Sequence, residues 1–498
     1  PIIGFIKVRL FINAYGSEVN GLQLTVAQVI NFLNICELAY SLAFRQLLYK
    51  PLAENDREGV KRIYYGAVRV FRITGIIVIT ASLVVALLFP YFSESPLSYS
   101  GTVATVLLLA LPYGISYFLM GPNFVIMADQ KEYKINILIQ TVAILRMVLM
   151  VLLIHFGASF FAILLVEAGN ILVSNTGARI IGFREYPWLK EKPADTKDHS
   201  FRDKAPYAMV QRLSELALTQ TDSIIISGEL GYAMSSVYGN YSYLSENIGK
   251  ISQSMVQSPM NSFGNLFNDP KRESYPIFLE FFNFAAYLAT VVAVCIFTVL
   301  PEFIPIWMQH DPLYAVDVGV CFWLALNIFY TTLRQPIIIV RDANGLYVNA
   351  RNNGYLLAAV KIVLSILLVG KFGIAGAVLG TAIAYWTVDF GYNPKLVYDK
   401  VFHLPVRRYV LLVLGRLATA LGIGLGSWWL WRKFFAPHAI TGVLPLIINI
   451  VLLGVIVLIV TAALYAMFFP GFRHLIARGR NVLARRRQKK TDRQGQKE

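Results

Sequence analysis

The sequence predicts an all-α polytopic membrane protein, on the evidence of its composition, its long apolar runs and its charge distribution. Hydrophobic residues make up 56% of the 498 positions, 15% are charged, and the mean hydropathy is +0.56. Soluble domains carry about 25% charged residues. The runs 73–89, 356–369 and 443–468 are almost free of charge over lengths near the roughly 20 residues that span a bilayer. A β-barrel would need alternating segments of about 10 residues, which the sequence lacks.

Hydrophobic runs between Pro, Gly and charge breaks predict fourteen spans. The first is expected to be truncated at its head, because too few residues precede Tyr15 and Gly16 to cross a bilayer. The predicted spans are 1–14, 21–49, 66–90, 99–127, 135–155, 159–182, 206–228, 235–262, 276–300, 313–340, 353–370, 373–392, 409–431 and 441–469.

The basic residues predict the orientation of these spans. One set of alternate loops and flanks holds 32 of the 45 Lys and Arg residues, whereas the other holds only Lys371, Arg432 and Lys433. Cytoplasmic loops carry such an excess, so we expect both termini in the cytoplasm. The net charge of +16 is therefore explained by the basic residues of the cytoplasmic loops, and no nucleic-acid partner is expected. The outward loops, such as 92–98 and 301–312, are too short to fold as a domain.

The chain is expected to form two lobes. The polar segment 184–204 predicts a cytoplasmic linker between a six-helix lobe (1–183) and a second six-helix lobe (205–400). Two further helices (401–470) and a basic cytoplasmic tail (471–498) follow. Four landmarks recur in the two lobes at offsets of 211–215 residues, which indicates a parallel repeat; coincidence among common residues is the alternative. They are Asn55-Asp56 with Asn268-Asp269, Pro90 with Pro301, Pro122 with Pro336, and Arg146 with Lys361.

Charges inside the spans are the candidate site residues. A charge at the bilayer centre costs at least about 2.5 kcal/mol and usually faces a cavity or a partner. Arg146 and Lys361 occupy matched places in the repeat, so we expect them on opposing lobes, where they would bind an anionic headgroup. The alternative is that each pairs with an acid on a nearby helix. The charges near mid-depth are Glu37, Arg146, Glu167, Glu246, Lys250 and Lys361.

Other charges lie closer to the predicted surfaces. Arg45, Arg212 and Arg334 are within one or two turns of the cytoplasmic side, where they could snorkel to lipid headgroups or capture an anion at the entrance. Lys250 is a further candidate for anion binding, although Glu246 lies four residues away and shares its helix face. Glu37, Asp222 and Glu246 are candidate cavity or coupling acids. For Asp222 the alternative is a hydrogen-bonded helix pair.

Several segments resemble one family over essentially the whole chain. The sequence is similar to the polysaccharide transporters, or O-antigen-type flippases, of the multidrug/oligosaccharidyl-lipid/polysaccharide exporter superfamily. The resemblance implies two six-helix lobes around a central cavity, alternating access, and flipping of undecaprenyl-diphosphate-linked oligosaccharides to the outer leaflet of the bacterial inner membrane. It does not select the glycan. The segments are RLFINAYG (9–16), LYKPLAEND (48–56), QTDSIIIS (220–227), VYGNY (237–241) and KFGIAGAVLGT (371–381).

Cofactors and metals are not expected. Cys36, Cys295 and Cys321 lie singly in apolar segments, with no paired metal-ligand spacing. No GxxxxGK[ST] phosphate loop occurs, so ATP hydrolysis by that route is excluded. The expected partners are the lipid-linked oligosaccharide and membrane lipids, with a proton or sodium ion as candidate coupling ion and glycan assembly proteins as candidate contacts.

Two other functions compete with glycan flipping. A cation-coupled multidrug exporter of the same superfamily would favour twelve spans and an acidic cavity, whereas this chain has fourteen predicted spans and many internal cations. An integral membrane enzyme acting on lipid-linked glycans would need an extended outer loop or a carboxylate-rich domain, and neither is present in the sequence. The prediction is therefore a transporter and not an enzyme.

Overall fold

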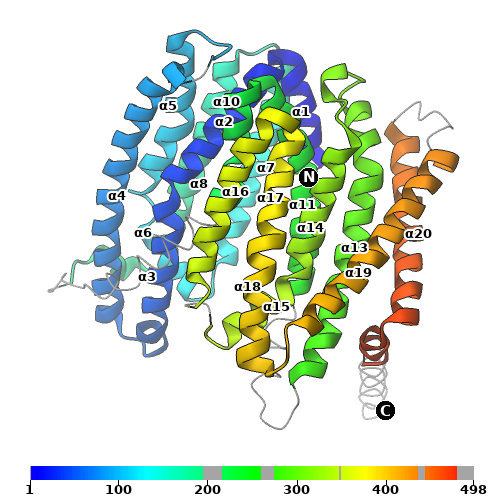
Figure 1. Ribbon diagram of the computed structural model, residues 1–498. Helices are drawn as coiled ribbons and strands as arrows, with labels where there is room; N and C mark the ends of the chain where they lie inside the picture. The colour runs from blue at the N-terminus through cyan, green and yellow to red at the C-terminus, as the bar shows by residue number, and fades with distance from the viewer. Residues whose placement is uncertain are drawn as a thin grey trace, which may run out of the picture. The chain divides into compact units, whose positions relative to one another are not determined.

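The computed structural model describes residues 2–92, 94–193, 216–258, 274–346, 349–435 and 443–478. Within these ranges the regular secondary structure is helical, without a strand (Figure 1). Nine helices of the described part are long and apolar enough to cross a membrane. The predicted all-α polytopic fold is confirmed, and the count of fourteen spans stays a prediction.

The chain divides into two compact units. The first unit comprises residues 1–239 and 365–377, and the second comprises residues 240–364 and 378–498. Three helices contribute residues to both units: α11 (Tyr232–Gln257), α16 (Arg351–Phe372) and α17 (Ile374–Ala384). The lobes, linker and tail expected from the sequence remain predictions.

The first unit is built from paired helices, with α4 packed along α5 and α7 along α8 (Figure 1). Its core contains stacked aromatic rings: the centroids of Phe71 on α4 and Phe124 on α6 are 4.8 Å apart, and Phe44 on α3 packs against Phe71. The helices of this unit are α1 (Ile2–Tyr15), α2 (Ser17–Leu33), α3 (Ile35–Ala53), α4 (Arg57–Phe92), α5 (Tyr99–Ser116), α6 (Gly121–Ala128), α7 (Tyr133–His155), α8 (Phe160–Glu185), η1 (Pro187–Lys190) and α10 (Asp222–Leu230).

The start of the predicted linker is docked on the first unit. Leu189 is fully buried, and the Tyr65 hydroxyl donates to the carbonyl of Lys190 at 3.1 Å. The ammonium of Lys61 on α4 lies 2.8 Å from a carboxylate oxygen of Glu191. We call Lys61, Tyr65, Leu189 and Glu191 the linker clamp. These contacts hold the chain against the first unit as far as residue 191, so the first part of the predicted linker is packed on that unit. Residues 194–215 lie outside the described part.

The second unit is organised around α13 (Ser274–Trp307). This helix packs against α14, α19 and α20. In its apolar stretch of 18 residues, 61% of the residues are buried inside the protein, compared with 11% in the corresponding stretch of α7. The other helices are η2 (Pro312–Tyr314), α14 (Val318–Leu333), α15 (Gln335–Ala343), α17 (Ile374–Ala384), the π-helix η3 (Tyr385–Asp389), α18 (Phe390–Val397), the π-helix η4 (Tyr398–Phe402), α19 (Arg407–Leu430), the π-helix η5 (Trp431–Phe435) and α20 (Val443–Phe468).

One predicted helix end was wrong because proline does not end the helix. We expected a span to end at 300, but α13 passes Pro301 and Pro305 and ends at Trp307. Helix α4 likewise passes Pro90, and it ends at Phe92, close to the predicted end. Membrane helices tolerate proline because neighbouring groups satisfy the freed backbone atoms. The outward loop predicted at 301–312 therefore begins only after Trp307. Gln309 and His310 in this loop have positive φ angles of 58° and 60°. A right-handed helix cannot continue through residues in this left-handed conformation.

Four spans expected to be continuous are interrupted within the described residues. The breaks lie at Asn34, at 220–221, at 117–120 and at Arg334. In the last two cases the following helix, α6 or α15, carries proline in its first turn, where the missing N–H has no intrahelical partner to lose. These two breaks precede Pro122 and Pro336, which are equivalent positions in the predicted repeat.

Candidate functional site

A cluster of three charges occurs within the helices of the first unit. Lys7 on α1 and Arg146 on α7 both contact Glu167 on α8. The Lys7 ammonium is 3.2 Å from Oε1 of Glu167, and Nη1 of Arg146 donates to Oε2. The three residues lie eight, nine and seven positions from Tyr15, His155 and Phe160 at the ends of their helices, or roughly 10–14 Å along the helix axes. We call Lys7, Arg146 and Glu167 the three-charge cluster.

The three-charge cluster has one more cation than anions. The side chains of Lys7, Arg146 and Glu167 are only 19%, 23% and 15% exposed. Within the described part of the chain, the buried Nε of Arg146 has no hydrogen-bond acceptor. A low-dielectric environment makes both an uncompensated charge and an unsatisfied donor costly. The cluster is therefore a place where an external anion would be stabilised.

A second ion pair lies in the second unit and is balanced in charge. Arg334, between α14 and α15, lies 3.1 Å from Oδ2 of Asp389, whose side chain is 4% exposed. The Tyr330 hydroxyl donates to the same oxygen at 2.7 Å, and Nδ2 of Asn393 donates to Oδ1 at 2.7 Å. Arg334 also stacks over the ring of Tyr385, 5.1 Å from its centroid. Both carboxylate oxygens of Asp389 are thus occupied by donors of the protein itself.

A π-helix positions Asp389. The wider turn of η3 places Asp389 at its last residue, directly before α18. Such π-helical turns are uncommon and frequently occur at functional sites. Sequence reasoning did not single out Asp389 or Lys7, although both lie within predicted spans. The signal that could have found them is the cost of any ionisable residue inside the membrane.

Polar side chains of α2 form a seam with α10, α11 and the turn before α10. Asn20, Thr25, Gln28 and Asn31 contribute from α2, and we call these residues and their partners the polar seam. Because apolar surfaces of helices gain little from association in lipid, such hydrogen bonds add specificity to helix packing. The pairs are Asn20 with Ser236 (2.8 Å), Thr25 with Ser235 (3.2 Å), Gln28 with Ser223 (2.9 Å) and Asn31 with Gln220 (2.8 Å).

Asp222 lies beside this seam and takes part in a helix–helix hydrogen bond. The residue is 5% exposed, and the hydroxyl of Tyr238 on α11 donates to its Oδ2 at 2.8 Å. This contact is of the kind that the hydrogen-bonded alternative predicted. A role for Asp222 in coupling remains a prediction.

The remaining predicted site residues occupy varied environments. Lys361 on α16 is fully buried, and the residue is not without an interaction partner. Lys250 pairs with Glu246 at 3.3 Å, as their spacing predicts, and both side chains are about half exposed or more. Arg45 lies 3.9 Å from Glu132. Whether Arg146 and Lys361 converge stays a prediction.

Two of the predicted site residues lie outside what the structure describes. These are Arg212 and the side chain of Glu37. The roles predicted for both in binding or coupling therefore remain predictions.

Arg416 is a further charge within the helices that sequence reasoning did not single out. Arg416 on α19 is 7% exposed; its Nη2 donates to Oδ1 of Asn283 on α13 at 2.8 Å. The guanidinium lies 4.0 Å from the ring centroid of Phe469, and an aromatic face attracts a cation electrostatically. Arg416 thus ties α19 to α13 and to the chain that follows α20.

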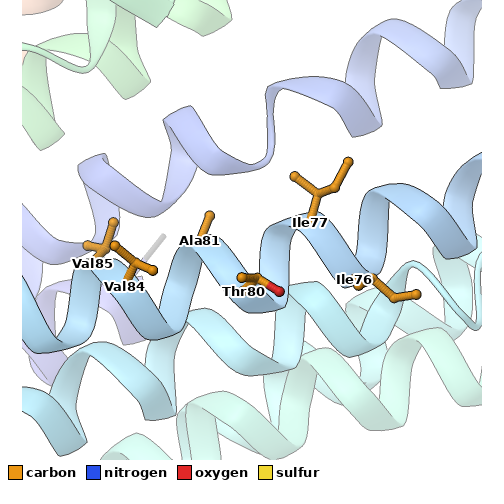
Figure 2. A pocket seen from close by; sticks show the side chains of 6 residues that line it. All are labelled: Ile76, Ile77, Thr80, Ala81, Val84 and Val85. Carbon is orange, nitrogen blue, oxygen red and sulfur yellow. The ribbon is translucent and has the colours of Figure 1, made fainter.

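Two hollows in the described surface are apolar, and neither is lined by any of these charges. One, of about 470 Å³, is lined by α4 alone, as Figure 2 shows. Its lining residues are Ile76, Ile77, Thr80, Ala81, Val84 and Val85. Another, of about 80 Å³, lies among α13, α14 and α19 and includes Phe297, Phe329 and Leu421. Such surfaces suit lipid chains rather than a polar headgroup. Among the described residues there is also no group of His, Cys, Asp and Glu side chains that could hold a metal ion.

Comparisons with known proteins find similarity in structure only. No family model matches the chain, and no curated protein matches it in sequence. The structure is similar to lipid II flippase MurJ in an inward closed conformation, with a TM-score of 0.70 and 14% identity over 95% of this chain and 97% of that one. It is also similar to an inward-facing multidrug resistance MATE family transporter of the MOP superfamily, with a TM-score of 0.61 and 13% identity over 80% of this chain and 94% of that one. The chain therefore has the fold of these membrane transporters.

Proposed function

We propose that this protein is a flippase that moves undecaprenyl-diphosphate-linked oligosaccharides from the cytoplasmic to the outer leaflet by alternating access, for export of cell-surface polysaccharide. The observation that carries the proposal is the three-charge cluster, in which two cations share one carboxylate. The fold shared with a lipid II flippase supports the general class. The residues of this chain that resemble polysaccharide transporters support the cargo.

A cationic site suits this cargo because the charged diphosphate of the cargo is the group that cannot cross the hydrocarbon core of the bilayer unaided. An isolated ion transferred to an apolar medium loses solvation worth tens of kcal/mol, so it must find partners inside a carrier. Arginine is well suited to phosphate oxygens, since its guanidinium presents several donors in a planar fork and stays charged. Arg146 and Lys7 would supply these donors from the first unit, and Lys361, fully buried on α16, would supply one from the second.

Removal of the two matched cations tests this function. Charge-assisted hydrogen bonds contribute about 1.5–3 kcal/mol each, so Arg146→Gln and Lys361→Gln should each slow transport about tenfold or more. Lys361→Arg should be tolerated better than Lys361→Gln because it retains the charge. The assay measures flipping of a fluorescent undecaprenyl-diphosphate oligosaccharide in proteoliposomes at equal protein content. Lys371→Gln, in a predicted outward loop, is the matched control and should flip normally. Full activity of the Arg146→Gln/Lys361→Gln double variant would refute the shared site.

The cellular role predicts where the glycan accumulates. A strain that lacks this protein and its paralogues should retain polyprenyl-linked glycan on the cytoplasmic leaflet. Surface glycan and leaflet-specific labelling of the lipid-linked precursor measure this directly. Normal surface glycan in the deletion strain would contradict the proposal.

The proposed direction of transport requires a defined topology in the bacterial inner membrane. With both termini cytoplasmic, impermeant thiol reagents added outside should label Ser95→Cys and Gln309→Cys but not Asp195→Cys. The reason is the distribution of 32 basic residues against three. Labelling of position 195 from outside would invert the assignment.

A multidrug exporter is the second candidate, favoured by the fold similarity to a multidrug resistance MATE family transporter. Such a carrier would use acids to bind cationic drugs. Here Asp389 is held by Arg334, Tyr330 and Asn393, which leaves its carboxylate with little capacity for an external cation. Drug sensitivity as the sole phenotype of the deletion strain would favour the exporter.

A further inference from the structure

The carboxylate of Glu167 occupies the position that an anionic ligand of the three-charge cluster would need. Its two oxygens contact different cations from different helices: Oε1 faces Lys7 on α1, and Oε2 accepts from Arg146 on α7. Glu167 therefore bridges the two cations as a single phosphate group would. The diphosphate of the cargo, taken as a whole, offers more non-bridging oxygens and more negative charge than the single carboxylate of Glu167.

The pairing with Glu167 leaves part of the cationic site unused. In the described structure Arg146 donates to Glu167 through Nη1, and its buried Nε has no acceptor. An arginine that binds a phosphate or carboxylate as a fork uses two donors at once. A ligand with more oxygens could satisfy Nε as well, so binding of the diphosphate in place of Glu167 would be favourable.

We infer that Glu167 is an internal anion that pairs with Lys7 and Arg146 in the empty carrier, is displaced by the diphosphate of the cargo, and returns to these cations when the cargo leaves. The inference rests on the proposed function and deepens it, because it assigns to Glu167 the control of cargo release. Glu167 is a positioning residue, since it acts through the two cations. The competing role is a permanent bridge that only ties α1, α7 and α8 together.

Binding of undecaprenyl diphosphate to purified protein separates the two roles. Loss of the competing charge in Glu167→Gln should tighten binding by about tenfold or more, since one charge-assisted bond contributes about 1.5–3 kcal/mol. Undecaprenol, which lacks the diphosphate, should bind wild type and variant equally. Glu54→Gln is the matched control, because it removes a carboxylate from an exposed ion pair with Lys50, outside the candidate site, and should leave diphosphate binding unchanged.

Turnover gives the second readout. If Glu167 assists release, Glu167→Gln should still complete a single flipping event but should slow multiple turnovers by about tenfold or more, a combination that a structural bridge does not produce. Glu167→Gln could also fold poorly, because it leaves two cations unpaired. The pair Lys7→Gln and Lys7→Gln/Glu167→Gln addresses this, since the double variant again has one uncompensated cation; it should bind the diphosphate more tightly than Lys7→Gln alone.

The outcomes distinguish this inference from the proposed function. Equal or weaker diphosphate binding by Glu167→Gln and by the double variant, at equal folded content, would overturn the internal-anion role. If wild type does not flip the glycan but Glu167→Gln still gains affinity for undecaprenyl diphosphate, the internal-anion role stands and the cargo assignment falls.

Discussion

Arg146 in the first unit and Arg334 in the second are both paired with an acid inside the helices, but the charges around them differ. Arg146 shares Glu167 with Lys7, which leaves a net positive charge. Arg334 has Asp389 to itself, and Tyr330 and Asn393 complete the hydrogen bonds of that carboxylate. Nε of each arginine lacks an acceptor within the described residues, so the balance of charge, and not the number of free donors, separates the two sites.

This difference indicates different roles. A balanced buried pair is expensive to break, because removal of one partner strands the other. An unbalanced cluster tolerates loss of one cation, since the acid keeps the other, but it then has less attraction for an anion. We therefore expect changes at Asp389 to affect stability first and changes at Arg146 to affect transport first.

The largest expected effect is loss of stability in Asp389→Ala. The substitution leaves Arg334 buried without its acid, and breaking such a pair costs about 3–5 kcal/mol. Thermal unfolding in detergent measures the loss. In Arg334→Met/Asp389→Ala, which removes both charges, much of the stability should return. A loss below about 1 kcal/mol in the single variant would show that Asp389 is less important to the fold than its contacts suggest.

The second effect is the opposite behaviour of Arg146→Gln. Lys7 can still pair with Glu167, so the free energy of unfolding should fall by less than in Asp389→Ala, while flipping falls about tenfold, equivalent to about 1.4 kcal/mol. Unfolding and flipping are measured on the same preparation. Similar losses of stability in Arg146→Gln and Asp389→Ala would remove the distinction between the two sites.

The polar seam should give a smaller effect that is confined to packing. Asn20 donates to Ser236 at 2.8 Å between buried side chains, and such a bond contributes about 0.5–1.5 kcal/mol. A double-mutant cycle with Asn20→Ala and Ser236→Ala should give a coupling energy near 1 kcal/mol. A coupling energy near zero would mean that the two side chains do not interact in the membrane.

The linker clamp and its neighbours should respond least, and only at low pH. The hydrogen bond from Lys61 lowers the pKa of Glu191. Burial raises the pKa of Asp129, but hydrogen bonds from Tyr186 and Lys131 outweigh it and leave that pKa below its usual value. A lowered carboxylate pKa contributes stability above the unfolded value of about 4, and this is lost as pH falls through the folded pKa. The protection of the amides at 188–191, that is, their exchange rate relative to the intrinsic rate at the same pH, should therefore be unchanged between pH 5 and 8.

The clamp also has a direct control. Glu191→Gln should expose residues 187–191 to exchange at pH 7, whereas Glu54→Gln, in an exposed pair with Lys50, should not. Lower protection in wild type at pH 5 than at pH 8 would show that another group controls the clamp.

The sequence by itself determined the class of the protein. Low charge and long apolar runs require lipid as the solvent, and a helix is the structure that satisfies its own backbone there; this depends on composition and not on contacts. The sequence also identified Arg146 as a costly charge, since any cation at that depth needs a partner. It placed proline at the breaks before α6 and α15, although it did not show that α4 and α13 continue past their prolines.

Only the tertiary structure decided which charges meet. Lys7, Arg146 and Glu167 are separated by up to 160 residues along the chain, and periodicity on one helix cannot state which neighbour it packs against. The same holds for Asp389, whose partner Arg334 lies at a helix break that the sequence pattern did not predict. The charge balance of a buried site is a sum over several helices, so it became visible only when the packing of α1 with α7, of α7 with α8, and of α15 with α18 was known.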